Sequence, residues 1–322
     1  MTRILVAAVL CAASFGVTAQ EKLSFIMSWK AQAEHGGYYM ALVKGYYKDC
    51  GVDMTIRQGG PGIDTAQLLV GGAVNFALVP YIEASLQMVQ AGFQGRAIMG
   101  TYQKSAQILM THPGNGINTM EDMRGKPIMI GASARTTFWA FLRNKYGWSD
   151  SQIRAYTGQL AVFFADKQVV QQALITNEPF LVRKQTGESP KVFLLYDHGY
   201  QTYGSIITTS QALIERNPKA VQCVVDAAVR GWNEFLRDPK PAFEAIKKEE
   251  AQNSDELMAY TYQTIKDARL VQTPETDKAG IGIMTDARWK GHYEMLLANN
   301  LIKPLDYRAG MDLRFVTKAA GK

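Results

Sequence analysis

Histidine, cysteine, serine and carboxylate side chains carry most protein chemistry, and their spacing in this sequence matches no catalytic or metal site. The four histidines, His35, His112, His198 and His292, are not at the short spacing at which pairs of histidines bind zinc. No Gly-x-Ser-x-Gly nucleophile elbow is present. Asp197 directly precedes His198, and adjacent side chains on an extended segment point to opposite faces. The sequence therefore predicts neither a catalytic constellation nor a metal site.

A second group of residues is suited to binding a ligand. These are aromatic and hydrogen-bonding side chains that follow the ends of predicted strands, where open α/β sheets bind their ligands. Aromatic rings can stack on a flat ligand, and amide or carboxyl groups can hydrogen-bond to its edge. The candidate ligand-binding residues are Trp29, His35, Tyr38, Gln58, Gly59, Tyr81, Tyr102, Gln103, Ser133, Thr136, Asn177, Glu178, Tyr200 and Tyr203.

Each of these candidates also has a purely structural interpretation. Trp29, Tyr38 and Tyr81 can equally be aromatics at the edge of a core. Gln58 and the glycines after it can serve turn geometry alone, because no Gly-Lys-Ser/Thr of a phosphate loop follows them. Glu178 can be a solvated turn residue. The hypothesis of a binding site depends on several such residues following strand ends at once.

The elements that would position these residues alternate between strands and helices. In the first part of the chain, the predicted strands are 23–27, 52–57, 74–79 and 96–102, and the predicted helices are 36–48, 65–70 and 82–90. In the second part of the chain, the predicted strands are 107–111, 127–130, 191–195 and 205–208, and the predicted helices are 135–146 and 169–174. From residue 211 onward the pattern predicts helices. Such alternation indicates mainly parallel sheets covered by helices on both faces.

The composition is that of a globular protein. The chain has 322 residues, of which 47% are hydrophobic and 20% charged, with a formal net charge of +6. This length predicts two domains or one large one. No run of Lys or Arg is dense enough for a phosphate-backbone footprint, so we expect no nucleic-acid partner.

The first nineteen residues have the pattern of an export signal. Arg3 precedes an apolar stretch over 4–13, and Val17-Thr18-Ala19 resembles a cleavage site. We expect a periplasmic protein that is cleaved near Ala19. The mature chain then keeps two cysteines, Cys50 and Cys223, and the sequence does not decide between one disulfide and two buried thiols.

Several stretches of the chain resemble a known family. Residues 29–39 (WKAQAEHGGYY), 44–48 (KGYYK) and 51–53 (GVD) are similar to periplasmic substrate-binding proteins of ABC transporters. The subgroup is the one that binds thiamine-pyrimidine precursors, alkanesulfonates or taurine, and nitrate. Residues 71–77 (GGAVNFA), 131–133 (GAS) and 176–179 (TNEP) extend the similarity over nearly the whole mature chain.

The resemblance implies a two-lobed α/β fold of type II, with a hinged cleft between two mainly parallel sheets flanked by helices. Lobe I would comprise residues 20–104 and 205–322, and lobe II residues 105–204. The resemblance also implies a monomeric binding protein without catalysis or cofactor. It would capture a small molecule and deliver it to the permease and ATPase subunits of an importer at the inner membrane.

Within that family, the sequence is most similar to the branch that binds the thiamine pyrimidine precursor, because Trp29 and His35 keep its spacing. The resemblance implies stacking by Trp29 and Tyr81 on a planar nitrogen heterocycle, with Glu178 accepting hydrogen bonds from an exocyclic amine. Lys30-Ala31 and Glu34 depart from that branch.

An alkanesulfonate, taurine or nitrate pocket is the alternative, although a carboxylate would repel these anions. A second alternative is a pyrimidine-synthesis enzyme of the same fold, whose cysteine-rich motif is missing here.

Overall fold

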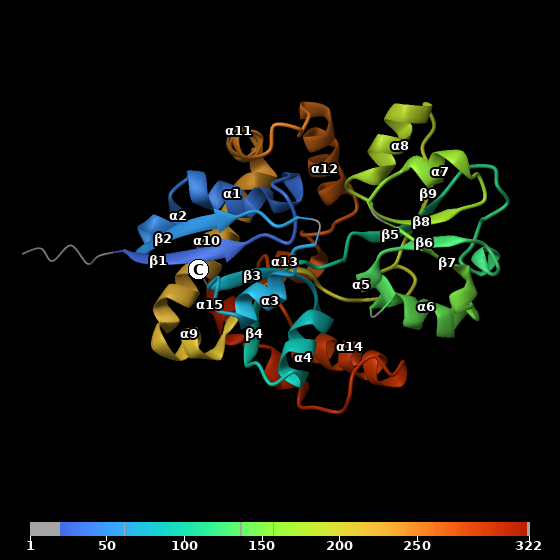
Figure 1. The fold of residues 1–322 in the computed structure, drawn as a ribbon. Helices are drawn as coiled ribbons and strands as arrows, with labels where there is room; N and C mark the ends of the chain where they lie inside the picture. The colour runs from blue at the N-terminus through green and yellow to red at the C-terminus, as the bar shows by residue number, and fades with distance from the viewer. Residues whose placement is uncertain (1–19, 61, 136, 157, 321–322) are drawn as a thin grey trace, which may run out of the picture.

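A computed structural model describes residues 20–320 of the chain, with the exception of residues 61, 136 and 157. The expected signal segment and Thr136 therefore lie outside the described residues. Two five-stranded sheets stand side by side, each flanked by helices (Figure 1). No helix in the described part of the chain is long and apolar enough to cross a membrane.

The first sheet has the strand order β2-β1-β3-β10-β4. Its strands are β1 (Glu21–Ile26), β2 (Val52–Arg57), β3 (Phe76–Tyr81), β4 (Gly95–Tyr102) and β10 (Gly204–Ser210). Neighbouring strands are parallel except at β10, which runs antiparallel to both β3 and β4. We refer to this sheet and the helices that pack on it as lobe I.

The second sheet repeats this plan, in the order β7-β6-β8-β5-β9. Its strands are β5 (Gln107–Thr111), β6 (Ile128–Ile130), β7 (Ile153–Ala155), β8 (Val170–Leu174) and β9 (Lys191–Leu194). Here β5 is the strand antiparallel to its neighbours β8 and β9. We refer to this sheet and its helices as lobe II. The prediction of two mainly parallel sheets in an α/β fold is confirmed.

Two of the predicted helices differ from the observed elements: one is a strand, and the other is divided in two. Residues 170–174 of the predicted helix 169–174 form strand β8, because their backbone pairs with β5 and β6 in the middle of the sheet. A short apolar run does not distinguish a buried strand from a helix. The predicted helix 36–48 is divided into α1 (Gly36–Val43) and α2 (Tyr46–Asp49), because Gly45 adopts a left-handed conformation with φ of +74°.

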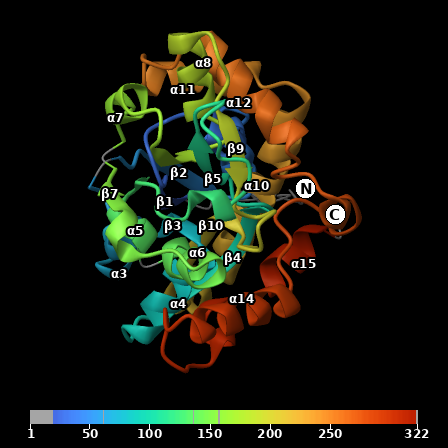
Figure 2. The same cartoon turned by 90° about the vertical axis from the view of Figure 1, so that its right-hand side faces the viewer.

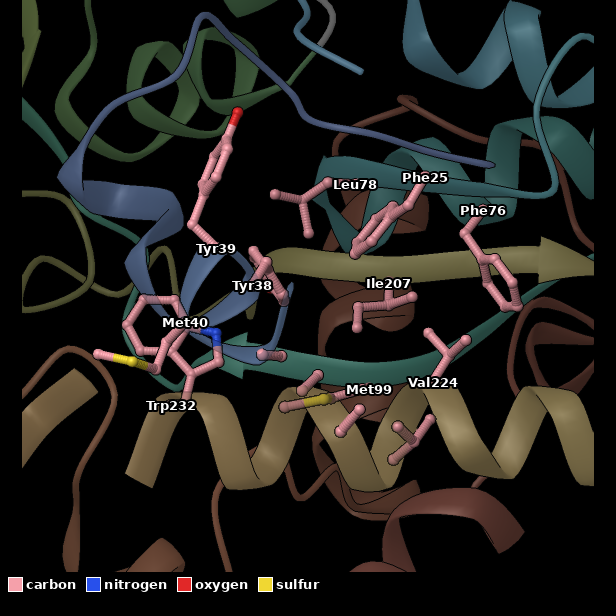
Figure 3. Close-up of a cluster of buried hydrophobic side chains, with 14 of the residues drawn as sticks. Phe25, Tyr38, Tyr39, Met40, Phe76, Leu78, Met99, Ile207, Val224 and Trp232 are labelled. Carbon is pink, nitrogen blue, oxygen red and sulfur yellow. The ribbon is translucent and has the colours of Figure 1, made fainter. Parts of the chain in front are cut away.

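The core of lobe I lies between its sheet and α10 (Pro218–Arg237). Phe25 from β1, Tyr38 from α1 and Trp232 from α10 meet there in edge-to-face contacts (Figure 3). Helices α1 and α10 approach closely at Gly231, where an added Cβ would lie 2.1 Å from the carbonyl oxygen of Gly37. The segment that follows β1 is therefore held in place by α10, a helix that is distant from it in the sequence.

The remaining helices pack around the two sheets. Around lobe I they are α3 (Thr65–Val70), α4 (Ile82–Gln90), α9 (Gln211–Arg216), α11 (Lys240–Glu249), α12 (Asp255–Asp267), α13 (Pro274–Ala279), α14 (Asp286–Ala298) and α15 (Arg314–Ala320). Around lobe II they are α5 (Ala132–Arg135), α6 (Phe138–Tyr146), α7 (Ala161–Ala165) and α8 (Glu178–Thr186). The C-terminal helices α14 and α15 return to pack near α4 and β4 (Figure 2).

Cys50 and Cys223 form a disulfide with a Cα–Cα distance of 5.6 Å. The bond joins the end of α2 to α10 across 173 residues of sequence. It answers the question that the sequence left open, and it fixes α10 to the N-terminal part of lobe I.

The chain passes between the two sheets twice. Residues 103–106 connect β4 to β5, and residues 195–203 connect β9 to β10. Helix α12 adds side-chain contacts between the lobes: the Tyr260 hydroxyl donates to the Ile175 carbonyl at 2.9 Å, and the Thr261 hydroxyl donates to the Thr176 carbonyl at 2.7 Å. The loops after β1 and β8 are thereby held near one another.

Candidate functional site

The loops after β1 and β8 meet at the junction of the lobes. The loop after β1 contains a short 3-10 helix, η1 (Ala33–His35), that carries Glu34. The loop after β8 carries Thr176, whose hydroxyl donates a hydrogen bond to Oε1 of Glu34 at 2.7 Å. The side chains at this contact are buried, with Glu34 only 7% exposed. This contact joins lobe I to lobe II.

Glu178 is the first residue of α8 and stands close to this contact. Its Oε1 accepts a hydrogen bond from the Tyr156 hydroxyl at 3.0 Å, and its Oε2 accepts one from the Leu174 backbone N–H at 2.8 Å. Burial raises the pKa of Glu178 above its usual range. The neighbouring Asn177 has a buried Oδ1 with no hydrogen-bond partner among the described residues. The predicted pair of an amide and a carboxyl is thus located at the lobe junction.

The electrostatics of the junction are set by Glu34 and Glu178. Burial raises the pKa of Glu34 to about 7, and the negative charge of Glu178 adds to this increase. The hydrogen bond from Thr176 acts in the opposite direction. Two carboxyl groups that share one buried region resist simultaneous ionisation. An additional anion bound beside them would meet the same repulsion.

His35 lies beside Glu34 and is buried. Its Nε2 is 3.3 Å from the Ser28 hydroxyl, and its Nδ1 has no hydrogen-bond partner in the part of the chain that the structure describes. Burial lowers the pKa of His35 to about 4, so the ring is neutral at physiological pH. The side chain can serve as a neutral donor or acceptor at the junction.

Trp29 stands on the same loop and is 41% exposed. The backbone N–H of Gly59 donates to the Trp29 carbonyl at 2.9 Å. Gln58 accepts a hydrogen bond from the Ala31 N–H at 3.0 Å and donates to the Glu249 carbonyl at 3.0 Å. An added Cβ at Gly59 would lie 2.4 Å from the Met27 carbonyl oxygen, so only glycine fits. Gln58 and Gly59 therefore position the Trp29 loop.

Tyr81 bridges the lobes at another point. Its hydroxyl donates to Oε1 of Gln107 on β5 at 2.8 Å, while its ring is partly exposed. Gln107 in turn donates to the Ala173 carbonyl at 2.8 Å. The contact places Tyr81, the last residue of β3, at the junction of the lobes.

Five other candidates have buried side chains that hydrogen-bond to the protein itself. Their rings and amide lie in the interior, each at most 3% exposed. The Tyr38 hydroxyl is 2.6 Å from the Thr101 hydroxyl, and that of Tyr102 donates to the Glu34 carbonyl at 3.3 Å. The remaining three are Gln103, which donates to the Gly100 and Ile283 carbonyls, Tyr200, which donates to Glu83, and Tyr203, which accepts from the Thr285 N–H. These contacts assign the five residues to the framework around the junction.

The last two candidates stand between β6 and α6. Ser133 belongs to α5, and Thr136 lies outside the described residues. The structure adds three residues to the candidate site that the sequence did not select: Glu34, Thr176 and Tyr156. Glu34 and Thr176 adjoin His35 and Asn177 in the sequence, and that proximity was the available signal. Tyr156 follows β7, a strand that the sequence pattern did not predict.

Two cavities in the described structure lie between elements of lobe I and lobe II, and neither is lined by Glu34, Thr176 or Glu178. One, of about 760 Å³, is between α6 and the end of α14 and includes Arg135, Arg143 and Asn299. The other, of about 450 Å³, is between α8, β9 and α12. Neither is lined by the candidate residues. Among the described residues, no group of three or more His, Cys, Asp or Glu side chains is placed to hold a metal ion.

Comparison with known proteins finds a relative that matches nearly the whole chain and others that match less than half of it. The chain is 25% identical to the riboflavin-binding protein RibY of Chloroflexus aurantiacus, over 92% of this chain and 86% of that protein. It is 28% identical to the 4-amino-5-hydroxymethyl-2-methylpyrimidine phosphate synthase of Schizosaccharomyces pombe, over 42% of this chain and 38% of the synthase.

Solved structures establish the fold. The periplasmic aliphatic sulphonate binding protein SsuA of Escherichia coli superposes with a TM-score of 0.69 over 91% of this chain and 92% of that one, at 13% sequence identity. At such identity the likeness extends to the fold alone. The family model described as NMT1/THI5 like matches residues 32–242, well over half of the chain. The protein therefore belongs to the NMT1/THI5-like family and has the two-lobed fold of periplasmic binding proteins.

Proposed function

We propose that the protein is the exported solute-binding component of an ABC importer, and that it captures a small planar nitrogen heterocycle between its lobes. The signal pattern that ends near Ala19 supports its export. The two-lobed fold supports this role, because two lobes joined by crossing segments can close on a solute and bury most of its surface. The permease and ATPase of the importer would then receive the solute unchanged.

The observation that carries the choice of ligand is the pair of carboxyl groups at the lobe junction. Carboxyl oxygens accept hydrogen bonds from ring N–H or amino groups, and Glu34 and Glu178 come from opposite lobes at this junction. A sulfonate or nitrate pocket instead requires donors without a neighbouring carboxylate. Trp29 offers an exposed aromatic face on the same loop as Glu34, and stacking on it would contribute about 0.5–1.5 kcal/mol beyond area burial.

The relatives support the same class of ligand. RibY is named for riboflavin, whose ring system contains a fused pyrimidine, and the yeast synthase is named for an aminopyrimidine phosphate. The match to RibY extends over most of both proteins, whereas the match to the synthase covers 38% of that enzyme. This difference favours a binding protein over an enzyme.

The experiment is a calorimetric titration of the mature protein with 4-amino-5-hydroxymethyl-2-methylpyrimidine, riboflavin and taurine. We expect binding of at least one heterocycle and none of taurine. The Glu178→Gln variant should bind the heterocycle at least about tenfold more weakly, because a charge-assisted hydrogen bond is lost. Glu188→Gln, an exposed residue beyond α8, is the matched control and should bind normally. Binding of taurine alone, or recovery of a chemically altered heterocycle, would refute the proposal.

A further inference from the structure

We propose that Glu83, Tyr200 and His292 form a buried cluster that holds lobe II in a defined orientation to lobe I. The three residues come from α4, from the crossing segment 195–203 and from α14, and we refer to them as the hinge cluster. Their role concerns the movement of the lobes and goes beyond the capture of a particular ligand.

Tyr200 belongs to both lobes at once. Its ring is part of the buried core of lobe II, with its centroid 6.2 Å from that of Phe138 and 5.7 Å from that of Phe141 on α6. Its hydroxyl donates a hydrogen bond to Oε1 of Glu83, which stands on α4 of lobe I. Tyr200 has no exposed surface, so water does not compete for the hydroxyl. A single side chain therefore connects the core of lobe II to a helix of lobe I.

The second carboxyl oxygen of Glu83 faces α14, which lies beside α4 (Figure 1). Nε2 of His292 is 3.0 Å from Oε2 of Glu83, and both side chains are buried. Neither of these two atoms has another hydrogen-bond partner among the described residues. The His292 ring also packs edge-on against Tyr200, with the ring centroids 5.6 Å apart. Because a buried polar group without a partner is costly, the three side chains depend on one another.

The backbone around the hinge cluster is held from both lobes. From lobe II, the Lys145 ammonium donates to the His198 carbonyl at 2.7 Å. From lobe I, the Arg288 guanidinium donates to the Thr202 carbonyl at 3.2 Å. The crossing segment is therefore fastened on each side of Tyr200, and the hinge cluster lies at its centre.

The position of the cluster on a crossing segment determines what it can control. When two lobes rotate relative to each other, the chain segments that pass between them move least, and a few residues there absorb the change in direction. Contacts at such a point can persist in every orientation of the lobes. A fixed contact between Tyr200 and Glu83 therefore restricts the directions in which lobe II can turn.

Tyr200→Phe separates this role from the packing of the ring. The substituted ring still fills its place in the core of lobe II, but the hydrogen bond to Glu83 is lost. Lobe II should then adopt orientations that the wild-type protein rarely visits. A Tyr200 hydroxyl that contributed only to local stability would change the free energy of unfolding and leave the lobe orientation as it is.

The test is a measurement of interlobe distances by pulsed electron paramagnetic resonance in the ligand-free protein. Spin labels are attached at Lys219→Cys on α10 and at Lys167→Cys after α7, because both positions are exposed and stand on different lobes. The native cysteines do not take up a thiol-specific label, since they are joined in the disulfide.

We expect Tyr200→Phe to broaden the distance distribution. The population outside the wild-type range should rise about tenfold, because a hydrogen bond to a buried carboxyl group is lost. Glu83→Ala should act in the same direction. The double variant should broaden the distribution no further than Glu83→Ala alone, because both substitutions remove the same contact.

Tyr293→Phe is the matched control, one residue from His292 on α14. The Tyr293 hydroxyl accepts from the Leu305 N–H at 2.9 Å, and both residues belong to lobe I. This variant should lose stability and keep the wild-type distances. An unchanged distribution in Tyr200→Phe, or equal broadening in Tyr293→Phe, would overturn the inference. Since no ligand enters the measurement, its failure is distinguishable from failure of the proposed function.

Discussion

Trp29 and Tyr38 show how differently two aromatic residues near one strand end can be placed. Trp29 is 41% exposed, whereas Tyr38 is fully buried between Phe25 and Trp232. The sequence assigned both to the candidate site with equal justification. It could not separate them, because the residue that covers Tyr38 comes from α10, far along the chain. Burial of individual aromatics is decided by such tertiary contacts.

Substitution of Trp29 tests its role as a stacking residue. Trp29→Ala should weaken heterocycle binding severalfold, since offset stacking contributes about 0.5–1.5 kcal/mol beyond area burial. Its free energy of unfolding should change by less than about 0.5 kcal/mol, as at other exposed positions. Calorimetry and urea unfolding measure the two quantities.

Tyr38→Phe is the contrasting variant. It removes the hydroxyl that lies 2.6 Å from the Thr101 hydroxyl, and it should cost about 1–2 kcal/mol of stability while leaving affinity unchanged. If Trp29→Ala lost stability and affinity together, Trp29 would be a core residue and not a ligand contact.

At the scale of elements, η1 combines two buried titratable side chains whose effects on stability oppose each other. The pKa of Glu34 is raised from 4.5 to about 7, so the folded protein binds this proton more tightly and loses stability as the pH rises from 4.5 to 7. The pKa of His35 is lowered from 6.5 to about 4, so its contribution is complete above pH 6.5 and is lost as the pH falls towards 4. The two slopes partly cancel in the wild type.

The Glu34→Gln variant should reveal the contribution of His35. Relative to wild type, it should gain stability by about 3 kcal/mol between pH 5 and pH 8, because the cost of ionising a buried carboxyl is removed. Urea unfolding at the two pH values provides the comparison, with the exposed Glu244→Gln as control. Parallel pH profiles for wild type and Glu34→Gln would contradict the assigned pKa of Glu34.

The disulfide between Cys50, at the end of α2, and Cys223 of α10 also acts at the scale of elements, because it joins two helices. Cys50→Ala/Cys223→Ala should lower the free energy of unfolding by up to about 5 kcal/mol, because the bond closes a loop of 173 residues in the unfolded chain. Urea unfolding of the oxidised protein and of the double variant measures this loss. Identical unfolding midpoints would contradict a stabilising role for the bond.

Elements were predictable where hydrophobic periodicity was long or regular. Alternation of Val52, Met54 and Ile56 with polar residues identified β2, and Asp64 correctly marked the start of α3 by accepting a hydrogen bond from the Gln67 N–H. The short segment 169–174 (VVQQAL) is predicted as a helix but forms a strand, because six residues fit either period. The pairing with β5 and β6 that makes it a strand depends on distant segments.

At the scale of the whole molecule, the alternating order of strands and helices was sufficient to predict the α/β class. Two sheets with the same strand plan, one antiparallel strand in each, join through residues 103–106 and 195–203. Of the two carboxyl groups at the lobe junction, only Glu178 could be predicted as a candidate site residue from the sequence. Glu178 followed a recognisable motif, whereas the approach of Glu34 to Thr176 requires both lobes to be assembled. Contacts between lobes leave no local pattern in either segment.

The central claim is that this assembly captures a planar nitrogen heterocycle. Native mass spectrometry of the mature protein, mixed with equal amounts of riboflavin, 4-amino-5-hydroxymethyl-2-methylpyrimidine and taurine, tests it in one measurement. We predict a one-to-one adduct with the mass of a heterocycle, which weakens in Glu178→Gln. An adduct with taurine alone, or none with any of the three, would contradict the account.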